Sequence, residues 1–170
     1  PEAAKAVGAF APKGTVISIA AAVTLEELAS YFPAGTRIVR VMPNTPVSVG
    51  EGYSAIAGGP AAQAEDIEKA KAIFGTLGRT AVVNERQLDE LGALSGAGPG
   101  YAFVIIDALA DAGVNIGLPR AVAIEAAAQT LYGAAKMVLE TGKHPAALRD
   151  QVTSPGGTTI AGIQMMERRG

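Results

Sequence analysis

The chain contains no cysteine and no tryptophan, and it has one histidine, His144, among 170 residues. The absence of cysteine excludes disulfide bonds, thiolate catalysis and zinc–cysteine sites. A single histidine also excludes a multi-histidine metal centre within one chain. Aromatic residues make up only 5% of the sequence. The core must therefore be built largely from alanine, valine, isoleucine and leucine.

Charge is scarce as well. Charged residues make up 18% of the chain, and the formal net charge is −2. This composition lacks the basic footprint of a nucleic-acid-binding protein. No apolar run reaches the roughly 18 residues of a membrane span, and no signal peptide is visible. With 49% hydrophobic residues, the chain should fold rather than remain disordered, and we expect it to bind neither nucleic acid nor membrane.

The first half of the chain alternates between strand and helix patterns. Short apolar runs rich in β-branched residues predict strands at 15–20, 37–42, 53–57 and 80–83, and apolar spacing predicts helices at 24–31 and 61–77. Thr24 and Glu27 fit a capping box at the start of the first of these helices. This alternation predicts an α/β fold with a mainly parallel sheet covered on both faces.

The second half, from about Glu85, shows helical patterns only. We expect a turn at 94–99 and helices at 101–112, 118–140, 145–150 and from 158 onward. The helix at 118–140 is apolar around much of its circumference, which is typical of a buried helix. A half-domain of this size offers little to bury it against, so we expect a partner subunit to cover it. We place the domain boundary between residues 85 and 86.

The strongest local candidate for a binding site is the segment 153–159. Gly156 and Gly157 allow unusual backbone shapes just before a helix that begins near Thr158. Unpaired N–H groups at such a helix start form an anion site, suited to a small carboxylate or a phosphate. An equally good local interpretation is that Ser154 merely caps a helix with Pro155 in its first turn.

Other features are weaker as sites. Two segments, Ser18 to Ala22 and Met42 to Pro46, follow or end expected parallel strands, where ligands bind in α/β sheets. Asn44 and Thr45 offer polar tips there, although ordinary turns explain both segments. The glycine-rich turn at 94–99 fits close packing better than phosphate binding. Lys136 is more typical of a solvent-exposed lysine than of a catalytic one, and His144 of a turn.

A spaced set of residues in the C-terminal quarter resembles the signature of the pyrroline-5-carboxylate reductase family. The set comprises Pro145, Leu148, Val152, Thr153, Ser154, Gly156, Gly157, Thr159, Gly162, Ile163, Met166 and Glu167. Further stretches resemble that family in the same order, namely 40–46, 94–103, 107–113, 117–120 and 133–137. The resemblance thus spans almost the whole chain.

This resemblance implies an oxidoreductase of proline biosynthesis. Enzymes of the family reduce the C=N bond of 1-pyrroline-5-carboxylate by hydride transfer from NADPH or NADH, which gives L-proline. The implied fold is the C-terminal part of a Rossmann domain at 1–85, followed by an all-helical dimerisation and substrate domain at 86–170. The family forms interlocked dimers, commonly assembled into decamers, and the implied location is the cytoplasm.

The resemblance also implies roles for particular residues, with no metal among them. The implied catalytic residue is Thr159, which would hydrogen-bond the ring nitrogen and assist its protonation. The implied substrate-binding residues are Val152, Ser154, Gly156, Gly157, Thr158 and Thr159. The implied cofactor-binding residues are Ala20, Ala21, Met42, Pro43, Asn44 and Val152.

The sequence departs from the family pattern in two respects. The family's first βαβ unit, which carries the pyrophosphate turn, would precede Pro1, and its final helix would follow Gly170. We therefore expect this piece alone to bind cofactor weakly and to turn over little. In addition, Ala21 and Ala22 stand where relatives often have Ala-Gly.

Two other functions stay open at this point. One is a dehydrogenase acting on 3-hydroxy acids, whose catalytic lysine would be Lys136 after Gly133. The other is an oligomerisation module that has lost catalysis.

Overall fold

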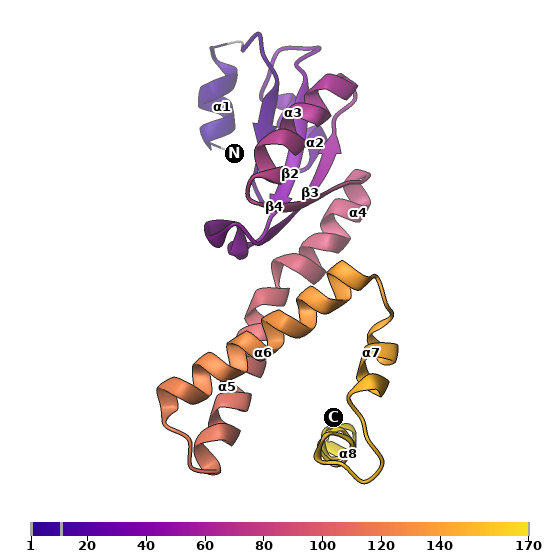
Figure 1. Cartoon of the computed structure of the whole chain (residues 1–170). Coiled ribbons are helices and arrows are strands. Elements are labelled where there is room, and N and C mark those ends of the chain that lie inside the picture. The colour runs from indigo at the N-terminus through magenta and orange to yellow at the C-terminus, as the bar shows by residue number, and fades with distance from the viewer. Residues whose placement is uncertain (1, 11, 170) are drawn as a thin grey trace. The chain divides into compact units, whose positions relative to one another are not determined.

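The computed structural model describes residues 2–10 and 12–169. The chain forms two compact units, residues 1–103 and 104–170. The first unit contains a four-stranded sheet of β1 (Val16–Ser18), β2 (Ile38–Pro43), β3 (Gly52–Gly58) and β4 (Gly78–Val82), in the spatial order β1-β2-β3-β4. Figure 1 labels β2, β3 and β4 of this sheet. Helix α1 (Glu2–Gly8) precedes β1. The four expected strands are therefore present, in the expected order along the chain.

The pairing of β2 with β3 differs from the parallel sheet expected. β1 pairs with β2 and β3 with β4 in parallel, whereas β2 and β3 are antiparallel. Between β2 and β3 the chain makes only the 3₁₀ turn η1 (Thr45–Val49) before it reverses at Gly50, which has a φ of 76°. A connection this short cannot cross over the sheet, so the two strands run in opposite directions.

Helices cover both faces of the sheet, as expected for an α/β unit. On one face, Val39, Val41 and Ile56 pack against Ala70 of α3 (Ala64–Gly75). On the other face, Ala55 and Ala57 pack against Leu88 of α4 (Glu85–Leu91), and Ile38 packs with Leu28 of α2 (Leu25–Ser30). Because side chains alternate along a strand, β2 contributes to both layers.

A buried arginine and its partner Glu85 link α2, β2 and α4. The side chain of Arg40 is only 2% exposed, and its Nη1 and Nη2 atoms lie 3.0 Å from Glu85 Oε1 and 2.8 Å from Asp89 Oδ1. The same Glu85 oxygen accepts a hydrogen bond from the backbone N–H of Leu25, at 2.6 Å. Arg40 Nε is buried without a hydrogen-bond partner. Glu85 is thus the common acceptor of two donors from different elements.

A buried carboxylate holds the opposite layer. The side chain of Asp66 is fully buried at the start of α3 and accepts hydrogen bonds from Thr15 Oγ1 and, at 2.9 Å, from the Gln63 N–H. Arg37 Nη1 lies 3.3 Å from the carboxylate. These hydrogen bonds, first that of Thr15 and then that of Gln63, together with the Arg37 charge, hold the pKa of Asp66 below its usual range despite burial. Asp66 therefore stays ionised and joins the starts of β1, β2 and α3.

The expected turn at 94–99 is instead part of a helix. A turn of π-helix, η2 (Gly92–Gly96), connects α4 to α5 (Gly98–Asn115), so that helical structure runs from Glu85 to Asn115. This run is long and apolar enough to cross a membrane by length and composition, contrary to the expectation from sequence. A single such helix is weak evidence, because core helices of water-soluble proteins have the same properties.

The second unit is helical throughout the part that the structure describes. It contains the rest of α5, α6 (Arg120–Thr141), α7 (Pro145–Gln151) and α8 (Thr158–Arg169). Its small core consists of Ala110, Ala123 and Ala127, with Ile106 and Val114 packed against them. In α6 only Ala123 and Ala127 are buried. The apolar circumference noted in the sequence is therefore largely open to solvent in a single chain.

Candidate substrate and cofactor site

The loop between α7 and α8 contains the segment singled out from the sequence. The Gly157 N–H donates to the Ser154 carbonyl oxygen at 3.0 Å, and Gly156 between them has a φ of 68°. With Pro155 in the second position, these are the features of a type II β-turn, which requires a positive φ at its third residue. The positive φ that this turn requires therefore explains why position 156 is glycine.

The turn ends at the start of a helix. Helix α8 begins at Thr158, so Ser154 and Pro155 lie outside it and do not form its cap and first turn. The first N–H groups of a helix have no partner within the helix and lie at the positive end of its dipole. Thr158 and Thr159 lie in this first turn, and both are exposed. The arrangement can present backbone N–H groups and hydroxyls to a small anion.

Of the remaining residues of this segment, Thr153 has a structural role, whereas Val152 and Ser154 are exposed. The Thr153 hydroxyl donates to the carbonyl oxygens of Arg149 and Asp150, at 3.2 and 3.1 Å, and so closes the end of α7. Val152 is 59% exposed, and Ser154 is also exposed. No residue from 152 to 159 has an ionisable side chain. The loop is therefore suited to binding and orienting a ligand through dipoles and hydroxyls.

Five of the six expected cofactor residues lie at one edge of the sheet in the first unit, and the sixth, Val152, lies in the second unit. Ala20 and Ala21 follow β1, and Met42, Pro43 and Asn44 end β2 or follow it. β1 and β2 are parallel neighbours with Ser18 opposite Arg40, so their carboxyl ends lie side by side. Ala20 also lines an open apolar groove of about 510 Å³ between α1 and β1. The small side chains leave room for a flat group at this edge, where ligands of α/β folds bind.

The substrate residues and the cofactor residues lie in different units. Val152, Ser154, Gly156, Gly157, Thr158 and Thr159 belong to the second unit, and Ala20, Ala21, Met42, Pro43 and Asn44 belong to the first. Each group is assembled within its own unit. Their use in one reaction is part of the function proposed below.

Ala22 has a strained backbone beside the cofactor edge. It has a φ of 57°, the one positive value of a non-glycine residue in the described part of the chain. The left-handed region costs an L-residue about 1–2 kcal/mol. This is the position where relatives are expected to have glycine, so the departure noted in the sequence falls where glycine has the largest advantage.

We predict that Ala22→Gly stabilises the protein by about 0.5–1 kcal/mol, since relief of strain outweighs the greater freedom of glycine in the unfolded chain. The matched control is Ala21→Gly, which has no positive φ to relieve and should destabilise by about 0.5–1 kcal/mol. Urea unfolding of both variants gives the comparison. Equal destabilisation by the two substitutions would contradict the prediction.

Two other side chains considered from the sequence have structural roles. Lys136 Nζ lies 3.5 Å from Glu140 Oε1 on the exposed side of α6. His144 caps α7, where its Nδ1 accepts from the Ala146 N–H at 3.2 Å. Neither arrangement matches a catalytic acid–base pair. The exposed ion pair of Lys136 fits a lysine that extends to solvent.

Shifted pKa values also lie away from the loop at 152–159. The hydrogen bond from Tyr31 to Glu27 raises the pKa of the tyrosine, and the Lys69 ammonium lowers the pKa of Glu65.

The Glu27 side chain does not complete the expected capping box with Thr24. Thr24 Oγ1 still accepts from the Glu27 N–H at 3.1 Å, while the Glu27 carboxylate accepts from Tyr31 at 2.6 Å.

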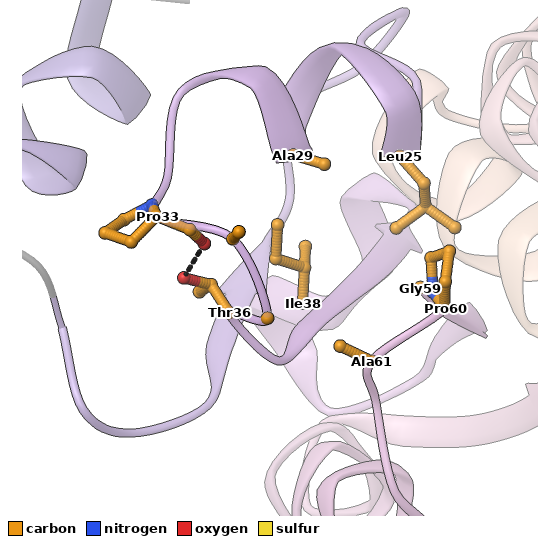
Figure 2. Close-up of a pocket in the computed structure, with 10 residues that line it drawn as sticks. Leu25, Ala29, Pro33, Thr36, Ile38, Gly59, Pro60 and Ala61 are labelled. Carbon is orange, nitrogen blue, oxygen red and sulfur yellow. Dashed lines mark hydrogen bonds between the residues drawn. The ribbon is translucent and has the colours of Figure 1, made fainter.

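A small cavity of about 160 Å³ lies beside α2 (Figure 2). Its one hydroxyl, that of Thr36, donates to the Pro33 carbonyl oxygen at 2.7 Å. The polar group is thus used within its own turn, and the cavity offers little to orient a nucleotide. The lining residues are Leu25, Ala29, Pro33, Ala34, Gly35, Thr36, Ile38, Gly59, Pro60 and Ala61.

Comparison with known proteins defines the class. Residues 85–170 match the family model described as pyrroline-5-carboxylate reductase dimerisation. The chain is 48% identical to the pyrroline-5-carboxylate reductase of Synechocystis over 155 residues, which are 91% of this chain and 58% of that protein. It is 47% identical to the Arabidopsis thaliana enzyme over 90% of this chain and 55% of that protein.

Solved structures agree with the sequence relatives. A pyrroline-5-carboxylate reductase from Coxiella burnetii superposes with a TM-score of 0.91 at 35% identity, covering 98% of this chain and 63% of that one. The Plasmodium falciparum enzyme, crystallised with NADP bound, gives a TM-score of 0.88 at 30% identity and covers 99% and 68%. The chain belongs to the pyrroline-5-carboxylate reductase family. It spans a little more than half the length of the curated relatives it matches.

The family match also bears on the exposed apolar helices. Tyr101, Phe103, Val104, Ile116, Tyr132 and Leu139 are each more than 45% exposed on α5, on α6 or between them. An apolar surface of this kind marks an interaction site. The matched model, a dimerisation region, covers both helices.

Proposed function

We propose that this chain forms part of an enzyme that reduces 1-pyrroline-5-carboxylate to L-proline with NADPH or NADH as hydride donor. The single observation that supports this most strongly is the Ser154–Gly157 turn at the start of α8, which offers backbone N–H groups and hydroxyls to a small anion. The substrate carboxylate is such an anion. The relatives' names and the NADP in the Plasmodium structure support the rest.

In this proposal the α7–α8 loop binds and orients the substrate. N–H groups at the start of α8, aligned with the helix dipole, hold the carboxylate. Thr159 hydrogen-bonds the ring nitrogen and assists its protonation, which keeps the C=N bond polarised. Val152 packs near the nicotinamide. When bound, the reduced nicotinamide supplies the hydride, and catalysis rests on proximity and orientation.

The cofactor lies at the edge formed by Ala20, Ala21, Met42 and Pro43. The small residues and the apolar groove beside β1 fit a flat ring and its ribose, and they include no metal ligand. NADPH and NADH both stay in the proposal, since none of these residues has a charged side chain that would select for or against a 2′-phosphate. We also propose a cytoplasmic location.

A second copy of the chain is the partner we propose for the apolar faces of α5 and α6. Their exposed side chains lie within the dimerisation match. Burial of such a surface is favourable at about 25 cal/mol per Å². An interlocked dimer, with decamers built from it, would remove this surface from water.

The test is the loss of reduced-nicotinamide absorbance when 1-pyrroline-5-carboxylate is added to the protein expressed from its complete gene. We expect turnover, and we expect Thr159→Val to lower it at least tenfold, about 1.4 kcal/mol of barrier. Absence of turnover with either cofactor would contradict the proposal.

Lys136→Met is the matched comparison, because a 3-hydroxy acid dehydrogenase would require that lysine. We expect a small effect, since Lys136 forms only an exposed ion pair. A larger loss with Lys136→Met than with Thr159→Val would favour the dehydrogenase.

A further inference from the structure

We propose that Asn44 is a positioning residue that supplies the hydrogen bond Pro99 cannot make, and thereby fixes the cofactor end of β2 against the π-helical turn η2. The proposal rests on the function proposed above only where activity is the readout. It also revises the role expected for Asn44, from a polar tip that contacts the cofactor to a clamp behind it.

The first step concerns the carbonyl oxygen of Ser95. Ser95 lies in the π-helical turn η2, where its oxygen would accept from the N–H five residues later, but that N–H, of Gly100, donates to the Ala97 carbonyl oxygen at 3.0 Å. In an α-helix, such as α5 that follows, the oxygen would accept instead from the N–H four residues later. That residue is Pro99, which has no N–H. Asn44 Nδ2 donates to the Ser95 oxygen at 3.0 Å. The side chain of Asn44 therefore occupies the place of the missing backbone donor.

The second step concerns the other half of the same amide. Asn44 Oδ1 accepts from the Tyr53 backbone N–H at 2.8 Å, in the second residue of β3. Both ends of the amide are thus engaged within the protein, one by η2 and the other by β3. Each end keeps one more donor or acceptor, but the two bonds fix the orientation of the amide, which joins the end of β2 to β3 and η2.

The third step concerns what the clamp holds in place. Met42, two residues before Asn44, lies against the glycine side of η2. A Cβ added at Gly92 would be 3.3 Å from Met42 Cε, and one added at Gly96 would be 3.9 Å from it. A Cβ at Gly92 would crowd the end of the Met42 side chain slightly, and one at Gly96 would make ordinary contact, so the Asn44 bond is the specific link between the end of β2 and η2. The end of the Met42 side chain thus packs against η2 and the Leu88 cluster, and the clamp fixes the backbone of Met42 and Pro43 at the proposed cofactor edge.

The test is a double-mutant cycle in which Pro99→Ala restores a backbone donor for Ser95. With Pro99 in place, Asn44→Ala should raise the unfolding equilibrium constant about tenfold, as expected when two partly buried hydrogen bonds are lost. In the Pro99→Ala background the same substitution should have a clearly smaller effect. Equal effects in the two backgrounds would overturn the proposal.

Asn84→Ala is the matched control. Asn84 caps α4 by accepting from the Gln87 N–H at 2.9 Å, far along the helix from Pro99. Its effect on unfolding should be the same in both backgrounds. A reduction of the Asn84→Ala effect in the Pro99→Ala background as large as that of Asn44→Ala would show that the coupling to Pro99 is not specific to the Ser95 bond, and would also overturn the proposal.

Asn44→Asp separates the two hydrogen bonds. The carboxylate keeps an acceptor for the Tyr53 N–H, but it places a second oxygen against the Ser95 oxygen. Amide hydrogen exchange at Tyr53 should stay slow in Asn44→Asp and become fast in Asn44→Ala. Fast exchange in both variants would contradict the assignment of the two ends of the amide.

Activity gives the last readout. We expect Asn44→Ala to raise KM for NADPH or NADH several-fold. Adding Pro99→Ala to that variant should bring KM most of the way back to the wild-type value. A KM effect that persists at full size in the Pro99→Ala background would assign Asn44 to direct cofactor contact instead. Absence of turnover in every variant would refute the proposed function, while the unfolding and exchange measurements would still decide the role of Asn44.

Discussion

Replacing Gly157 by alanine should raise KM for 1-pyrroline-5-carboxylate between tenfold and a hundredfold, roughly one hydrogen bond to a charged group. A Cβ at this position would be 2.6 Å from Ser154 Oγ and 3.2 Å from the Ser154 carbonyl oxygen. The hydroxyl can rotate away at little cost, so the protein should stay folded. Its displacement changes the groups that the loop presents to the substrate carboxylate.

The measurement is steady-state reduction by the wild type and the variant, with stability followed in parallel. Gly162→Ala is the matched control, because no atom lies within 4 Å of a Cβ added there and the site is inside α8. Alanine in a helix interior should raise stability slightly and leave KM unchanged. An unchanged KM in Gly157→Ala would argue that this loop does not hold the carboxylate.

The sequence predicts the elements of the first unit better than their pairing. Apolar β-branched runs mark each strand because burial on both faces requires them, and this pattern is visible without structure. Strand direction depends on the connections. The segment from Pro43 to Gly52 has no helical pattern long enough for a crossover, so its shortness was the available signal for the antiparallel pair.

The helical run from Glu85 to Asn115 shows a second limit of prediction from the sequence. Glycines and a proline at 92–99 are typical of a turn, and locally they favour one. The structure keeps the helix by widening one turn at η2 and by recruiting Asn44, which is 51 residues away from Ser95 in sequence. A contact across such a separation depends on the fold and is not visible in a local pattern.

The candidate site also combines features set by adjacent residues with features that depend on the whole fold. The Ser154–Gly157 turn is encoded by adjacent residues, so proline and glycine spacing predicts it from sequence. The resemblance places Ala20 and Met42 near the cofactor, and parallel pairing of β1 with β2 brings their strand ends together. The strain at Ala22 is visible only from its dihedral angle.

The second large effect is expected at Glu85, where substitution by alanine should destabilise the protein by about 2 kcal/mol. One oxygen of Glu85 accepts from both Arg40 Nη1 and the Leu25 N–H. Loss of that oxygen leaves two donors unpaired at the start of α4. One of them belongs to the Arg40 side chain, which is 2% exposed. The Glu85 side chain is itself 33% exposed, so water should partly replace it and keep the effect below that of a fully buried pair.

Comparison within the same network tests this explanation. Asp89 also pairs with Arg40, but it is 56% exposed and serves one donor, so Asp89→Ala should cost less than about 1 kcal/mol. Glu90, paired only with exposed Arg86 at 3.6 Å, is the matched surface control and should change stability by less than about 0.5 kcal/mol. Urea unfolding of the three alanine variants should therefore rank Glu85 first, Asp89 second and Glu90 last. If Glu85→Ala and Asp89→Ala cost the same, the bond to Leu25 contributes nothing, and pairing with Arg40 would explain the contribution of both carboxylates.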